Sequence, residues 1–159
     1  MEEYLLEARE ELKRLEHIIY VSLKYTRTVD VIINALNRMV GTFDNIIEAF
    51  LEKAKEEGKI ESLPKSPALR AKRVSEIYSD DEKLQRYLHF YTFLKTVLKA
   101  EPEKRQEYRR HVTFIVPLEK STAEIKIDNL TYAEKYMHEF LQYARLKILG
   151  TSEEDEDEF

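Results

Sequence analysis

Cysteine and tryptophan are absent from this 159-residue sequence, which contains only three glycines and four prolines. Without cysteine there is no disulfide framework, thiol nucleophile or Cys-based zinc site. Three scattered glycines also exclude the glycine-rich loops that bind nucleotide phosphates. Because glycine and proline interrupt regular structure most strongly, their scarcity leaves residues 1–40, 68–101 and 118–149 free to be helical. The sequence therefore predicts an all-α fold.

Long apolar runs are also missing, since no stretch approaches the ~20 residues that a membrane-spanning helix requires. The opening segment, MEEYLLEAREELK, is acidic and amphipathic, unlike the basic and then apolar pattern of a secretion signal. We therefore expect no membrane association and a cytoplasmic location.

Charge is abundant and unevenly distributed. Charged residues make up 36% of the chain, against about 25% in typical globular domains, and such a composition is seen in proteins from thermophiles. Residues 153–158 are six consecutive acids; without them, 26 basic residues face 25 of the 31 acidic ones. We expect one domain over 1–150 and a disordered acidic tail over 151–159. That tail is either a solubilising segment or a mobile polyanion that docks on a basic surface.

Apolar residues in the first third follow alternating steps of three and four, with only Ser22 and Thr26 polar. The positions are Leu5, Ala8, Leu12, Leu15, Ile19, Ser22, Thr26, Val29, Ile33, Leu36, Val40, Phe43, Ile47, Phe50 and Ala54. This seam fits one long helix that needs a partner chain, or a helical hairpin that turns near residues 26–28. Extra apolar residues beside the seam favour the hairpin. We also expect a homodimer formed through the seam.

The remaining helices are marked by their ends. Residues 58–67 read as a linker, after which Ser66 and Pro67 begin a short helix. Residues 79–82 form a capping box that starts a helix ending near Ala100. Pro102 is expected to open another short helix that runs to about residue 110. A last helix is expected to be capped by Asp128 or Asn129 and to end at Gly150. Together these make a bundle of four main helices.

Residues 111–128 are the least helical part of the sequence. Val112, Phe114 and Val116 alternate with other residues, as do Ala123, Ile125 and Ile127. This alternation predicts a short β-hairpin packed on the helices. The competing interpretation continues the preceding helix through Phe114 and leaves the rest as loop.

A basic segment lies just before this hairpin. Five of the eight residues 104–111 can carry positive charge, and we expect nucleic acid to contact Lys104, Arg105, Tyr108, Arg109 and Arg110. Further basic residues extend the patch if the helices pack that way: Arg70, Lys72, Arg73, Lys95 and Lys99. The alternative is a solvated helical face that pairs with neighbouring acids.

Arg105 is followed by the polar residue Gln106 and, with five residues between, by His111. This arrangement resembles the motif of the HEPN family of small all-α domains. The resemblance spans residues 1–149 and implies a homodimer in which the Arg–His pairs face each other across a cleft. It implies that Arg105 holds a scissile RNA phosphate and that His111 is the general acid–base. Cleavage of this kind needs no metal.

Other chemistry has little support in the sequence. No histidine follows a carboxylate by three residues, so the paired Glu-x-x-His motifs of a di-iron bundle are absent. Glu134 with His138, and Glu107 with His111, are expected to be exposed hydrogen-bonded pairs, and we expect no metal and no cofactor. Three hypotheses remain, one of which is a helical subunit of a larger nucleoprotein complex whose basic patch provides only affinity. The other two differ in class. One is a non-enzymatic helical interaction or scaffold protein with a protein partner, and the other is a HEPN-like RNA-binding protein or endoribonuclease.

Overall fold

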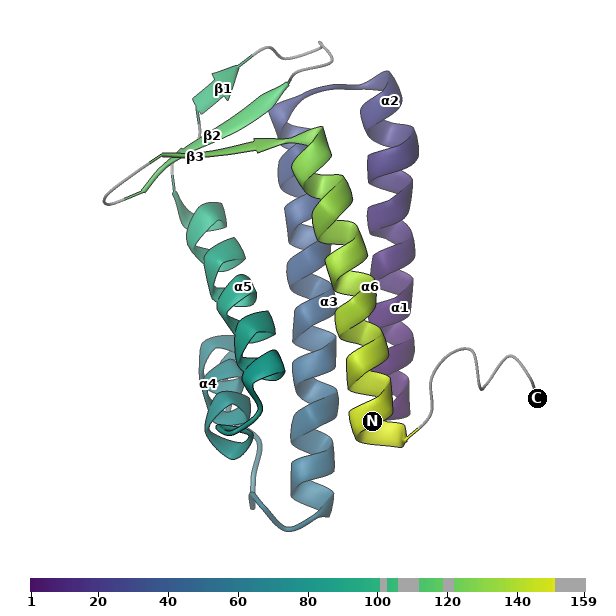
Figure 1. Cartoon of the computed structure of the whole chain (residues 1–159), viewed down its shortest axis with the longest axis vertical. Helices are drawn as coiled ribbons and strands as arrows, with labels where there is room; N and C mark the ends of the chain where they lie inside the picture. The colour runs from purple at the N-terminus through teal and green to yellow at the C-terminus, as the bar shows by residue number, and fades with distance from the viewer. Residues whose placement is uncertain (101–102, 106–111, 119–121, 151–159) are drawn as a thin grey trace, which may run out of the picture.

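A computed structural model describes residues 1–100, 103–105, 112–118 and 122–150. Its elements follow the order α1 (Glu2–His17), η1 (Ile18–Ser22, a π-helix), α2 (Leu23–Tyr25), α3 (Val29–Glu56), α4 (Pro67–Ile77), α5 (Glu82–Lys99), β1 (Glu103–Arg105), β2 (Thr113–Pro117), β3 (Thr122–Lys126) and α6 (Ile127–Leu149). The α1–α2 segment, α3, α5 and α6 form a bundle, with α4 beside α5 and the strands across one end (Figure 1). The predicted all-α bundle is confirmed, whereas the acidic tail, 151–159, lies outside the described residues.

The first third of the chain is a helical hairpin, as predicted. Thr26 has extended backbone and ends α2. Thr28 begins α3 by accepting a hydrogen bond from the backbone N–H of Val31 at 3.3 Å. The two arms pack together, so that Leu5, Leu12 and other seam residues are buried within one chain. The seam is therefore covered within one chain, and the homodimer stays a prediction.

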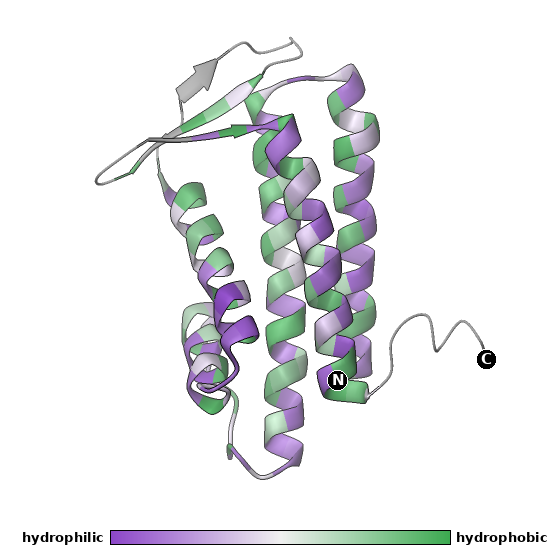
Figure 2. Cartoon of the chain, viewed as in Figure 1, coloured by the Kyte–Doolittle hydropathy of each residue, from purple (hydrophilic) through white to green (hydrophobic). Residues whose placement is uncertain are grey.

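Helix α3 is buried more broadly than a heptad seam requires. It packs against α1 on one side and against α4, α5 and α6 elsewhere, and its apolar residues extend around the helix (Figure 2). Ile32 and Ala35, which lie off the seam, are fully buried. Ile33 and Val40, which lie on it, are only partly buried. A helix with neighbours on several sides needs a wide apolar face, which explains the additional apolar residues.

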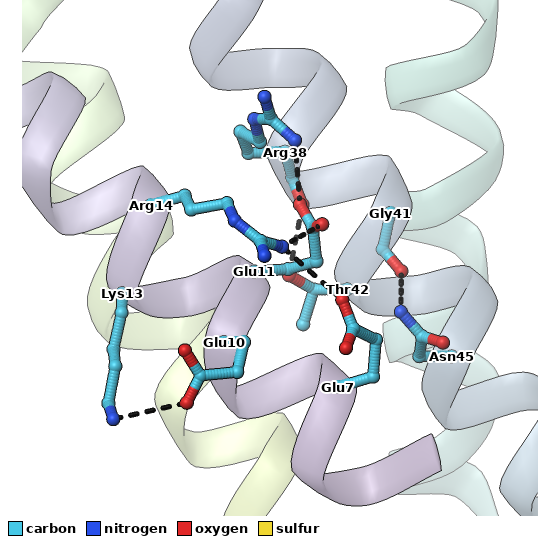
Figure 3. A network of polar contacts seen from close by, with 9 residues as sticks. All are labelled: Glu7, Glu10, Glu11, Lys13, Arg14, Arg38, Gly41, Thr42 and Asn45. Atoms are coloured by element: carbon cyan, nitrogen blue, oxygen red, sulfur yellow. Dashed lines mark hydrogen bonds and ion pairs between the residues drawn. The ribbon is translucent and has the colours of Figure 1, made fainter. Parts of the chain in front are cut away.

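Gly41 lies in the middle of α3, where α1 approaches closely. A Cβ atom at this position would sit 3.3 Å from Oε2 of Glu11. The Glu11 carboxylate is held there by Arg14, at 2.6 Å, and by Arg38, at 3.4 Å (Figure 3). The helix runs through this glycine without a break, so Gly41 marks a close approach of two helices.

Aromatic rings fill the space between α3, α5 and α6. The Phe43 ring centroid lies 5.3 Å from that of Tyr91 and 5.0 Å from that of Phe140. Tyr87 meets Phe140 edge-on at 4.3 Å, and Tyr136 packs beside Phe90 at 5.3 Å. Such tilted and edge-on pairs are the favoured geometries for aromatic side chains. Tyr87, Tyr91 and Tyr136 therefore pack helix against helix, whereas Tyr132 of α6 is exposed.

The helix ends agree with the sequence in part. Ser66 accepts a hydrogen bond from the backbone N–H of Leu69 and Pro67 begins α4, as predicted. For α5 the capping residue is Asp81, rather than Ser79, because its carboxylate accepts from the backbone N–H of Leu84.

Helix α6 begins earlier than predicted. It starts at Ile127, directly after β3, and its N-cap residue is Lys126 rather than Asp128 or Asn129. Asn129 still takes part in the start of the helix, because its side-chain oxygen accepts from the backbone N–H of Lys126 at 2.9 Å. Gly150 ends the helix with φ of 77°, a left-handed conformation that favours glycine.

Three antiparallel strands cross one end of the bundle in the order β1-β2-β3. Phe114 pairs with Ile125, and both side chains are buried on the helices, which confirms the hairpin. The helix expected from Pro102 to about residue 110 is wrong at Glu103–Arg105, which pairs with β2 as a strand. A paired strand edge supplies backbone hydrogen bonds that outweigh a short segment's helix propensity.

Candidate functional site

A groove between α4 and α5 gathers basic side chains over an apolar floor. We call this surface the α4–α5 groove; its volume is about 340 Å³. Four basic residues line it: Lys72 from α4, with His89, Lys95 and Lys99 from α5. Among the described residues that line it, none is acidic. A concave surface of one charge sign concentrates field and attracts ligands of the opposite sign, so this groove suits an anion.

Helix periodicity explains why the lysines of α5 face the same way. Lys95 and Lys99 are four residues apart, which places them on one face, about 6 Å apart along the helix axis. Leu88, Ala68 and Ala71 contribute apolar surface beneath them. The groove thus combines charge with an apolar floor for the flat face of a ligand.

Tyr91 forms part of the groove wall and ties it to the core. Its hydroxyl donates to Oδ1 of Asp44 on α3 at 2.6 Å, and the ammonium of Lys95 lies 5.6 Å from its ring centroid. Burial raises the pKa of the Asp44 carboxyl, and the Tyr91 hydrogen bond and the nearby Lys95 charge oppose that rise. The side of the groove that faces α3 is therefore held by packed and hydrogen-bonded groups.

The sequence anticipated part of this surface. Of the five basic residues expected to extend the patch, Lys72, Lys95 and Lys99 line the groove. Arg70 instead pairs with Glu48 of α3 and donates to the Pro64 carbonyl. Arg73 pairs with Glu76 along its own helix at 3.2 Å. His89, at first sight an ordinary residue at the edge of an apolar stripe, was not singled out.

The basic segment of the sequence is only partly described. Lys104 and Arg105 lie on β1, which follows α5 by a few residues, at the same end of the bundle as Lys99 (Figure 1). Tyr108, Arg109, Arg110 and His111 lie outside the described residues, as do Gln106 and Glu107. The proposed pairing of Arg105 with His111 therefore stays a prediction.

On another face of the bundle, Glu134 and His138 form the expected contact, with His138 Nε2 at 2.9 Å from Glu134 Oε1. The pair is not simply exposed, because Glu134 is buried, with only 6% of its surface accessible. A third residue, Glu16 of α1, also reaches Nε2 of His138, at 2.6 Å. Glu16 is distant in the sequence, so local spacing could not have indicated it.

Comparisons with family models, with curated proteins and with solved structures find no match to this chain. The resemblance to the HEPN family thus gains no support from them. Within the described part of the chain, helices that combine the length and the apolar character required to cross a bilayer are absent.

Proposed function

We propose that this protein is a helical RNA-binding protein that holds single-stranded RNA in the α4–α5 groove. The observation that supports the proposal is the convergence of Lys72, Lys95 and Lys99 on one groove whose described lining has no acid. Lysine ammonium groups contact phosphates as point charges, and counterions released from the RNA provide the free energy of binding.

The rest of the lining supports a single strand. Unpaired bases stack on apolar and aromatic side chains, including histidine. Ala68 and Ala71 offer apolar surface, and His89 offers an exposed ring. Duplexes, by contrast, are read by an element that protrudes into a groove of the nucleic acid.

Hydroxyl groups in the groove favour RNA over DNA. Thr92 and Thr96 donate their hydroxyl hydrogens to backbone carbonyls one turn earlier, at 3.1 and 3.0 Å. Each threonine hydroxyl oxygen can still accept a hydrogen bond, and a ribose 2′-hydroxyl can donate one to it. The bound RNA would then continue from Lys99 toward Lys104 and Arg105 on β1.

Fluorescence anisotropy with a labelled single-stranded RNA tests this function. The groove variant carries Lys72→Gln, Lys95→Gln and Lys99→Gln. A control variant with the same change in net charge carries Lys13→Gln, Lys24→Gln and Lys135→Gln, at exposed positions on α1, α2 and α6. We expect the groove variant alone to bind weakly and to lose roughly 2 from the slope of log K against log salt, since each phosphate contact on a single strand contributes about 0.7.

Equal binding by the two variants would overturn the proposal, as would salt-independent binding. The same RNA incubated in EDTA tests the cleavage hypothesis. If RNA is cleaved, and if Arg105→Ala and His111→Ala each abolish the cleavage while binding persists, the protein is an endoribonuclease that uses the groove to hold its substrate.

A further inference from the structure

Two carboxylates and one imidazole converge between α1 and α6, away from the α4–α5 groove. Glu16 lies in the last turn of α1, and Glu134 and His138 are four residues apart on one face of α6. Nε2 of His138 is 2.6 Å from Oε1 of Glu16 and 2.9 Å from Oε1 of Glu134. All three atoms lie within 4.8 Å of one another.

Hydrogen bonding alone accounts poorly for this arrangement. An imidazole nitrogen carries at most one hydrogen, so Nε2 can donate one full hydrogen bond, while two carboxylates approach it. The Glu134 side chain is only 8% exposed. A buried carboxylate beside a second carboxylate is costly unless a cation compensates it.

A divalent transition metal fits the same three atoms. We propose that Glu16, Glu134 and His138 bind one Zn²⁺ ion, with water as the fourth ligand. Zinc accepts imidazole nitrogen and carboxylate oxygen at about 2.0–2.2 Å, in tetrahedral sites whose ligand atoms are about 3.3 Å apart. The two carboxylate oxygens lie 2.6 and 2.9 Å from Nε2 of His138, so the Glu16 and Glu134 side chains need to move only slightly outward to reach that spacing. Glu16 and His138 are 40% and 45% exposed, so the ion can enter from solvent.

The helix next to Glu16 supports the site. Ile18–Ser22 is a π-helix, a rare form that occurs frequently at functional sites. It presents Tyr20, whose hydroxyl lies 3.5 Å from Oε2 of Glu134. This contact engages the carboxylate oxygen that does not face His138, which leaves Oε1 directed toward the shared position. Tyr20 is thus a positioning residue that orients a metal ligand.

Isothermal titration calorimetry of the whole chain with ZnCl₂ tests the site. Glu16→Gln and His138→Gln are the test variants, because both residues lie outside the buried core and their side chains are 40% and 45% exposed. His17→Gln is the matched control, since His17 is an exposed histidine beside Glu16. We expect one saturable Zn²⁺ site in the unmodified protein and in the control, and at least a tenfold weaker one in each test variant. Circular dichroism checks that all the variants are folded.

A second readout is thermal unfolding. An ion that binds only the folded state raises the melting temperature as its concentration increases, so Zn²⁺ should stabilise the unmodified protein and His17→Gln but not Glu16→Gln. Three results would overturn the proposal: no saturable Zn²⁺ binding, unchanged affinity in both test variants, or equal affinity for Mg²⁺, which would indicate a site built from carboxylates alone.

Discussion

Phe43 is the side chain whose removal tests the bundle most severely. It lies on α3, has none of its surface exposed, and packs its ring against Phe90, Tyr91 and Phe140. Phe43→Ala removes a buried ring and leaves a cavity that rigid neighbours cannot close, which costs about 3–5 kcal/mol. A domain of this kind has only about 5–15 kcal/mol of stability in total. The variant should therefore fold but be markedly weakened.

Urea unfolding followed by far-ultraviolet circular dichroism measures this loss. With an m-value of about 2 kcal/mol/M, the midpoint should fall by about 1.5–2.5 M. Phe93→Ala is the control, because Phe93 on α5 is 41% exposed and its replacement should cost no more than about 0.5 kcal/mol. If the two variants unfold at the same urea midpoint, then α3, α5 and α6 do not pack around Phe43.

Three further predictions concern titration and helix ends. Burial raises the folded-state pKa of Asp44 above its ordinary 3.8, so the stability that its neutral form provides is complete below pH 3.8 and is lost as pH rises through the raised value. Asp44→Asn stays neutral and should therefore gain stability relative to the unmodified protein over that rise in pH, as measured by urea unfolding, and a pH-independent difference would contradict this. Thr28→Ala removes the cap of α3 and should cost about 1 kcal/mol, whereas Thr26→Ala, at an exposed position outside the helix, should cost less. Gly150→Ala places a side chain at φ of 77° with no atom within 4 Å, so backbone strain alone should lower the free energy of unfolding by about 1 kcal/mol, and an unchanged melting temperature would argue against the left-handed cap.

The helices could be predicted because their signals are local. Ser66 and Gly150 mark helix ends at the boundaries of apolar patterns, polar residues near 26–28 indicated the turn, and the alternation around Phe114 indicated β2. Glu103–Arg105 was missed because its strand conformation depends on pairing with β2, a partner that short-range patterns do not reveal. The hairpin was predicted, but on α3 the seam missed Ile32 and Ala35, which are more deeply buried than the seam residues Ile33 and Val40 because α3 has neighbours on several sides.

The candidate sites depend on packing between elements, so the sequence indicated them only in fragments. Lys95 and Lys99 share a face of one helix, which spacing shows, but Lys72 joins them only because α4 lies beside α5. Glu134 and His138 were likewise visible as a pair, whereas Glu16 is 122 residues from His138. Chemistry assembled across helices requires the fold before its residues can be grouped.

The most direct test of the proposed function is to map where RNA binds. Amide chemical shifts of isotope-labelled protein can be followed by nuclear magnetic resonance during titration with a short single-stranded RNA. The amide shifts that change most should belong to α4 and α5 around Lys72, His89 and Lys95, and those of α1 should be unaffected. Changes confined to α1 and the outer face of α6, or none at saturating RNA, would contradict the proposed function.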